Sequence, residues 1–123
     1  MKKLITFKEL LHGANTNVII NCKVIGCINC EIALAHTYCV MDTDKECIAI
    51  VIFNLSLNRG LKLGDNLLIN DPFLTLFDIH YENNNYKFQS VRIDNPLLLM
   101  VNGKCLTKDH IARPRIDNSL RND

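Results

Sequence analysis

The stretch TNVIINCKVIGCI, residues 16–28, decides the fold class, because its apolar side chains recur at every second position. That period places them on one face of a β-strand, whereas a helix would need apolar residues every three or four positions. The apolar face carries Val18, Ile20, Cys22 and Val24. Asn21 and Lys23 fall on the other face. Gly26 allows the strand to bend or bulge, as closing a barrel requires.

The same alternation continues along the chain and predicts further strands. They are expected at residues 34–41 and 46–54, from the turn at 64–65 to residue 81 (interrupted by Pro72, which indicates an edge or a bulge), and at 86–94. Turn residues separate them at 42–45 (DTDK), 64–65 (GD), 82–85 (ENNN) and 102–103 (NG). Residues 55–61 are expected to form a short helix or an irregular connection, and residues 96–101 a closing apolar segment.

Three consecutive strands, a connection and a hairpin follow the order of an all-β, five-stranded Greek-key OB barrel. A β-sandwich would need about seven strands. We therefore predict a lead-in over residues 1–14, an OB domain over 15–106 and a flexible polar tail over 107–123.

Composition is consistent with one small domain that has no strong attraction to nucleic acid. The 123 residues include 14 basic and 13 acidic side chains, a net charge of +1. The longest apolar runs, 48–53 and 96–101, are too short to span a membrane, and no signal peptide is evident. An intracellular chain keeps its cysteines reduced, so we expect small buried hydrophobes instead of a disulfide framework. The cysteines are Cys22, Cys27, Cys30, Cys39, Cys47 and Cys105.

Six blocks of sequence point to a family. In chain order they are TYCVMD (37–42), CIAIVIFN (47–54), LGD (63–65), NDPFL (70–74), YKFQSVRI (86–93) and PLLLMVNGK (96–104). Together they resemble the C-terminal OB domain of the Strap family of tetratricopeptide-repeat stress-response cofactors. The last two blocks carry most of the resemblance, because OB domains in general do not share them.

The resemblance implies an adaptor in the nucleus and cytoplasm, without enzymatic activity. The family acts in stress-responsive transcription with a histone acetyltransferase, and at the ribosome, where recognition of nascent tubulin triggers decay of tubulin messenger. Its N-terminal helical repeat array reads the tubulin peptide. No 34-residue helical period occurs here, so that activity does not transfer, and we expect either an excised domain or a stand-alone relative. The resemblance also implies ribosomal RNA contacts by Lys2, Lys3 and Lys8, the alternative being a solvated end.

Catalytic and metal motifs are not evident in the sequence. The histidines at 12, 36, 80 and 110 are scattered, and no nucleophile elbow, zinc-protease or phosphate-loop pattern occurs. Cys27 and Cys30 have the spacing of a zinc knuckle but lack a second pair. His36 and Cys39, three apart on a strand, must point to opposite faces. We predict no enzyme, no metal and no cofactor.

Two surfaces are candidates for binding. An OB domain binds single-stranded nucleic acid through aromatic stacking, and the cationic and aromatic candidates are Tyr38, Tyr81, Tyr86, Lys87 and Arg92. The third strand is apolar on both faces. One face carries Cys47, Ala49, Val51 and Phe53, and the other carries Ile48, Ile50 and Ile52.

One apolar face of that strand must fill the barrel, and the other must be covered. We expect the isoleucine face, with Tyr38, to bind a protein partner such as a helical repeat array. The alternative is that residues 96–101 or 4–11 cover it within the domain. A single-stranded nucleic-acid binder and a purely structural module remain as rival functions.

Overall fold

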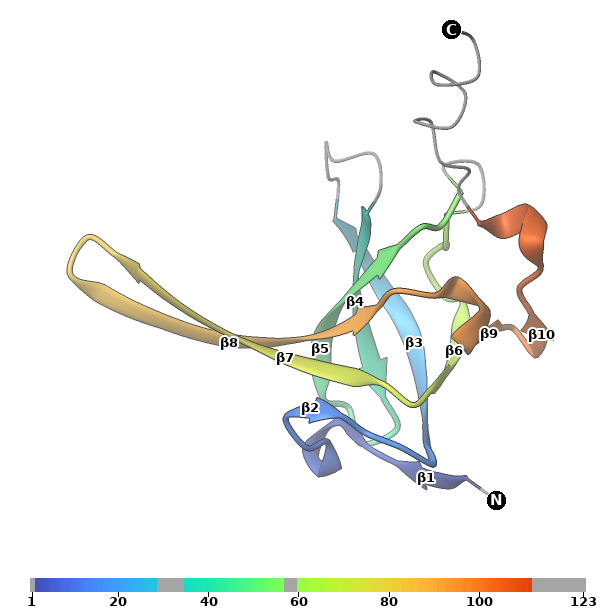
Figure 1. The fold of residues 1–123 in the computed structure, drawn as a ribbon, viewed down its shortest axis with the longest axis horizontal. Coiled ribbons are helices and arrows are strands. Elements are labelled where there is room, and N and C mark those ends of the chain that lie inside the picture. Colours follow the sequence, from blue (N-terminus) through green and yellow to red (C-terminus); the bar gives the residue numbers. More distant parts are fainter. Residues whose placement is uncertain (1, 29–34, 57–59, 112–123) are drawn as a thin grey trace, which may run out of the picture.

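The computed structural model describes residues 2–28, 35–56 and 60–111, and these form one ten-stranded sheet (Figure 1). The strands are β1 (Lys3–Ile5), β2 (Gly13–Ala14), β3 (Val18–Ile28), β4 (Ala35–Asp42), β5 (Cys47–Phe53), β6 (Asn66–Asn70), β7 (Phe73–Tyr81), β8 (Asn84–Ile93), β9 (Leu99–Val101) and β10 (Lys104–Cys105). Short 3-10 turns lie at η1 (Phe7–Glu9), η3 (Pro96–Leu98) and η4 (Lys108–His110). Among the described residues, no helix has the length and apolar character needed to cross a bilayer.

The order of the strands confirms the predicted OB fold. β3, β4 and β5 pair antiparallel in succession, β5 then pairs in parallel with β8, and β8 pairs antiparallel with β7. β6 pairs with the other edge of β3. Only Asp71 and Pro72 separate β6 from β7, so the chain itself connects the two ends of this strand series. Figure 1 shows the strands wrapping around a common interior.

The predicted number of five strands is wrong. One reason is that the predicted fourth strand is divided into β6, which pairs with β3, and β7, which pairs with β8. Pro72 has no N–H to donate, and Asp71 has a left-handed backbone (φ 48°), so the chain turns sharply between them. The N–H of Asp71 donates to the Val18 carbonyl at 3.0 Å, which ends the pairing with β3. Beyond Pro72, β7 pairs with β8 instead.

The N-terminal lead-in and the closing segment both join the sheet. β1 pairs in parallel with β3, and β2 pairs with the first residues of β7. The closing segment is η3 followed by β9, which pairs with β6. Beyond Thr107, where a flexible tail was predicted, η4 and a bridge between Leu55 and Ile111 remain ordered. The rest of the predicted tail, 112–123, and part of the predicted 55–61 connection lie outside the described residues.

Gly26 has the role expected of it, because the register between β3 and β4 shifts between Val24 and Gly26. A β-bulge of this kind bends a strand and increases its twist, so that β3 can pair with β4 on one side and β6 on the other. The turn at Asn102-Gly103 is also confirmed, with φ of 52° and 82°.

The core is a single apolar cluster inside the curved sheet. Its fully buried side chains include Ile20, Val40, Ile50, Leu67 and Val91, which come from five different strands. Because close-packed side chains from five strands form this core, it provides a rigid support for the β7–β8 hairpin.

Candidate protein-interaction surface

The β7–β8 hairpin extends well beyond the body of the protein (Figure 1). The two strands pair from Phe73 and Arg92 at the base to Tyr81 and Asn84 at the tip. Within the described residues, β2 pairs with β7 no further than Leu74, and β5 pairs with β8 only from Ser90 onward. The outer half of the hairpin therefore has two unpaired edges. Its two-residue turn places Glu82 and Asn83 at positive φ, the geometry that matches the twist of the strands.

The two faces of this hairpin differ in chemistry, since side chains alternate along each strand. One face is apolar and aromatic, and its exposed fractions run from 38% at Phe77 to 63% at Tyr81. We call it the aromatic face, and its members are Phe77, Ile79, Tyr81, Tyr86 and Phe88. Beyond Leu76, the opposite face carries Asp78, His80, Asn85, Lys87 and Gln89.

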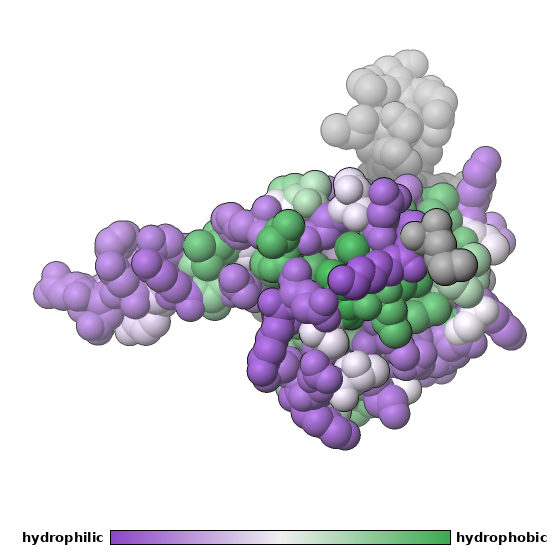
Figure 2. All heavy atoms as spheres, turned by 90° about the horizontal axis from the view of Figure 1, so that it is seen from below, coloured by the Kyte–Doolittle hydropathy of each residue, from purple (hydrophilic) through white to green (hydrophobic). Residues whose placement is uncertain are grey.

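The aromatic face is organised, because the rings of Phe77 and Phe88 stack with centroids 4.9 Å apart. Figure 2 shows hydrophobic atoms where the hairpin leaves the body and hydrophilic atoms toward its tip. Exposed aromatic side chains grouped in this way are typical of interaction sites, in contrast to single surface hydrophobes, which are ordinary.

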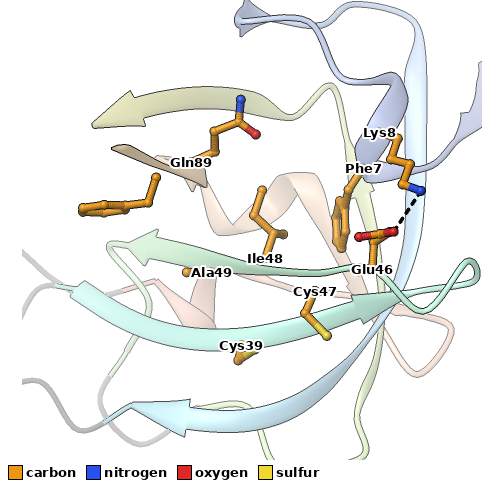
Figure 3. Close-up of a pocket in the computed structure, with 9 residues that line it drawn as sticks. Phe7, Lys8, Cys39, Glu46, Cys47, Ile48, Ala49 and Gln89 are labelled. Carbon is orange, nitrogen blue, oxygen red and sulfur yellow. Dashed lines mark ion pairs between the residues drawn. The ribbon is translucent and has the colours of Figure 1, made fainter. Parts of the chain in front are cut away.

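A hollow of about 470 Å³ lies along the first residues of β5, between η1 and the base of the hairpin (Figure 3). Phe7 and Lys8 from η1 and Phe88 from β8 contribute to its walls. Lys8 forms an ion pair with Glu46 at 2.9 Å across it. The remaining lining residues are Cys39, Glu46, Cys47, Ile48, Ala49 and Gln89. The hollow has acidic and basic groups already paired, so it offers no free charge to a ligand.

The isoleucine face of the third strand is not the predicted partner surface. Ile50 and Ile52 are fully buried and Tyr38 is 5% exposed, while Ile48 is half-buried and packs against the core. The Tyr38 hydroxyl accepts a hydrogen bond from the Leu61 N–H at 2.9 Å. These side chains fill the barrel, and the outer face of β5 carries Cys47, Ala49, Val51 and Phe53 instead. The alternative, that this face is covered within the domain, is consistent with its burial in a core cluster that also contains Ile5, Phe7, Leu10 and Leu99.

The proposed nucleic-acid contacts do not form one basic surface. Lys2 pairs with Asp71 at 3.1 Å, and this hydrogen bond lowers the pKa of Asp71. Arg92 pairs with Asp94 at 2.7 Å and lies 4.7 Å from the ring centroid of Phe53. Lys8 is paired with Glu46, as described above.

The other members of that set lie apart from one another. Tyr81, Tyr86 and Lys87 are on the hairpin, with Lys87 on the face opposite both tyrosines. Lys3 is in β1, at the far side of the barrel from the hairpin tip (Figure 1). These two lysines and two tyrosines therefore do not form one continuous surface for a strand of nucleic acid.

Sequence reasoning missed Phe77, Ile79 and Phe88 as surface residues. The signal was present, because apolar residues recur at every second position on both sides of the polar turn 82–85. Only the pairing pattern shows that this alternation continues past the point where neighbouring strands end.

The expectation of buried cysteines holds only for Cys22, among the cysteines that the structure describes. Burial raises the pKa of the Cys22 thiol to about 12. Cys27, Cys47 and Cys105 are exposed and Cys39 is half-buried, because the β4–β5 face that carries Cys39 and Cys47 is the outer one. Cys30 lies outside the described residues. Within the described ranges, no three His, Cys, Asp or Glu side chains gather as metal ligands.

Comparison with known proteins places the whole of this architecture in one family. The family described as "Tetratricopeptide repeat protein 5 OB fold domain" matches residues 1–115. Tetratricopeptide repeat protein 5 of Homo sapiens is 36% identical over 95 residues, which are 77% of this chain and 22% of the relative. The proteins of the same name from Bos taurus and Mus musculus are 35% and 34% identical over the same shares. The chain thus spans 22% of the length of these curated relatives.

Proposed function

Because the chain belongs to the Tetratricopeptide repeat protein 5 OB fold domain family, we propose that it is a non-catalytic protein-interaction module, an adaptor, that binds through the aromatic face of its β7–β8 hairpin. The observation that carries this proposal is the exposure of five apolar and aromatic side chains on the outer half of a hairpin, where the described residues leave both edges unpaired. Burying them would remove a large apolar area from water, which drives association.

The partner we propose is a tetratricopeptide-repeat array. The relatives are named as tetratricopeptide repeat proteins, and 78% of their length lies beyond the aligned segment (100% minus the 22% covered). A two-stranded hairpin is only marginally stable in water, so a partner that covers the aromatic face would also stabilise the hairpin. Bound to a repeat array that reads the tubulin peptide, as in the family, such a module would take part in stress-responsive transcription and in tubulin-messenger autoregulation, in the nucleus and the cytoplasm.

Protein is favoured over single-stranded nucleic acid by the charges. Three of the cationic candidates, Lys2, Lys8 and Arg92, are neutralised by neighbouring carboxylates. Binding to a phosphate backbone depends on cations that can replace counterions, and paired cations contribute little to it. The aromatic face also carries no Lys or Arg among its five members.

The test is binding of the whole chain to the repeat portion of human Tetratricopeptide repeat protein 5, measured by titration calorimetry. The double variant Ile79→Ser/Tyr86→Ser should weaken binding at least tenfold, because this cross-strand pair lies at the centre of the exposed face. The matched control is His80→Ser/Lys87→Ser, which alters the opposite face of the same hairpin and should keep the dissociation constant within about twofold. Equal effects of the two variants, or no binding by the unmodified chain, would contradict the proposal.

A further inference from the structure

The outer face of the β4–β5 pair brings three sulfur-bearing side chains together. In the register, Cys39 lies opposite Ala49 and Met41 lies opposite Cys47. Cys39 and Met41 are two residues apart on β4, so they share a face, and Cys47 is the direct neighbour of Met41 on that face. Val40, between Cys39 and Met41 on β4, is fully buried in the core, so the face that carries the sulfur atoms is the outer one.

The two thiols are close to one another. Burial raises the pKa of the Cys39 thiol, and the Cys47 thiol raises it further through its charge and a hydrogen bond. Figure 3 shows the two sulfur atoms on adjacent strands at one side of the hollow. Both cysteines are free, Cys47 is exposed and Cys39 is half-buried, so an ion from solvent can reach them.

We propose that Cys39 and Cys47, with the Met41 thioether beside them, form a binding site for Cu(I). Thiolate and thioether sulfur are soft ligands that suit this ion. Zinc requires four ligands in a structural site, and no further His, Cys, Asp or Glu joins the pair within the described residues. Cu(I), in contrast, is satisfied by two or three sulfur ligands.

The binding step balances as an exchange of protons for metal. Each thiol releases its proton to solvent and forms a sulfur–copper bond as a thiolate, and no electron is transferred because copper enters already reduced. The site then carries one net negative charge, the sum of two thiolates and one monovalent cation.

The test uses the full chain with Cys27, Cys30 and Cys105 replaced by Ser, which leaves Cys39, Cys47 and the buried Cys22. This background is titrated with Cu(I) under nitrogen, with ascorbate as reductant and bicinchoninate as competitor. We expect one equivalent to bind. Adding Cys39→Ser or Cys47→Ser should weaken binding about 100-fold, and adding Met41→Leu about tenfold. Circular dichroism and the melting temperature verify that each variant is folded.

The proposal would be overturned if the Cys39→Ser or Cys47→Ser variant still bound Cu(I) as tightly. It would also be overturned if the chain with Cys27, Cys30 and Cys105 replaced by Ser (the Ser background) did not bind Cu(I). Equally tight binding of Zn²⁺ in a parallel titration would overturn it as well. If the Ser background does not fold, the unmodified chain is followed by NMR during the titration. The amides of residues 39–49 should then shift with the first equivalent, and a first response at residues 27–30 instead would refute the site.

Discussion

The carboxylate of Asp42 holds the backbone of Phe7, since its Oδ2 accepts a hydrogen bond from the Phe7 N–H at 2.9 Å. Its Oδ1 accepts two more, from the N–H groups of Asp44 at 3.0 Å and Glu46 at 2.9 Å. Asp42 is 5% exposed. One buried side chain thus shapes the β4–β5 turn and anchors η1, which carries Phe7 into the core and Lys8 to the hollow.

Replacing Asp42 should destabilise the protein strongly. Asp42→Ala leaves three backbone N–H groups without their acceptor, and the expected loss in the free energy of unfolding is about 3 kcal/mol. Urea denaturation followed by circular dichroism measures it. Asp44→Ala, an exposed change in the same turn, serves as control and should stay within about 0.5 kcal/mol. A loss under about 1 kcal/mol for Asp42→Ala would show that water replaces the carboxylate without cost.

The isoleucine face of β5 should behave as core. Ile50 is fully buried, so Ile50→Ala should cost about 2–5 kcal/mol in the free energy of unfolding, and Ile50→Asp should abolish cooperative folding. Thermal unfolding distinguishes these outcomes. The neighbouring Val51→Ala, on the outer face, should cost clearly less. A folded Ile50→Asp protein with lost partner binding would restore the docking role for this face.

The ion pair of Lys2 and Asp71 predicts a pH effect with a defined sign. The hydrogen bond from Lys2 lowers the pKa of Asp71 below its ordinary value of 3.8. A carboxyl group whose pKa is lower in the folded than in the unfolded protein stabilises the fold at pH values above its pKa in the unfolded chain. This stabilisation is lost as the pH falls through its pKa in the folded protein. In Lys2→Met, the pKa of Asp71 should therefore rise toward 3.8, as followed by NMR titration of its carboxyl carbon. An unchanged value would assign the lowered pKa to the backbone N–H groups of Asn17 and Val18.

The stacked pair of Phe77 and Phe88 should hold the outer hairpin together. Phe77→Ala removes the stacking, worth about 0.5–1.5 kcal/mol beyond the buried area, from the outer half of the hairpin, which pairs with no further strand among the described residues. Amide hydrogen exchange should accelerate in residues 78–87 and remain slow in β3 and β4. Lys87→Ala, on the opposite face, is the control and should leave the exchange rates of the hairpin nearly unchanged. Unchanged amide exchange rates in Phe77→Ala would show that the turn, and not the stacked rings, keeps the outer hairpin folded.

Single-stranded nucleic acid should bind weakly. Because Lys2, Lys8 and Arg92 are paired, oligo(dT) is expected to bind no tighter than about 100 µM at physiological salt, the weak end of non-specific affinity. Fluorescence anisotropy of a labelled oligonucleotide measures this. Micromolar binding that falls steeply with added salt would favour the nucleic-acid function over the protein-interaction function.

Local patterns allowed much of the fold to be predicted. The alternation in residues 18–24, the bend at Gly26 and the turn at Asn102-Gly103 depend on residues close in sequence, and the structure has them as expected. The break at Pro72 was also visible, since proline cannot donate to a strand ladder. The result of that break was not visible, because the partner of β6 is β3, whose paired residues lie 43 to 51 positions away, whereas β7 pairs with β8 over 3 to 19 positions.

The sequence by itself determined the long central β-strands, the OB fold and the family, because these follow from side-chain alternation, turn residues and local blocks of sequence. Only the tertiary structure decided which apolar face of β5 is inside and where the β7–β8 hairpin leaves the body. The physical reason is that both faces of β5 are apolar, so alternation does not distinguish them. Burial depends on which distant strands pair across the barrel.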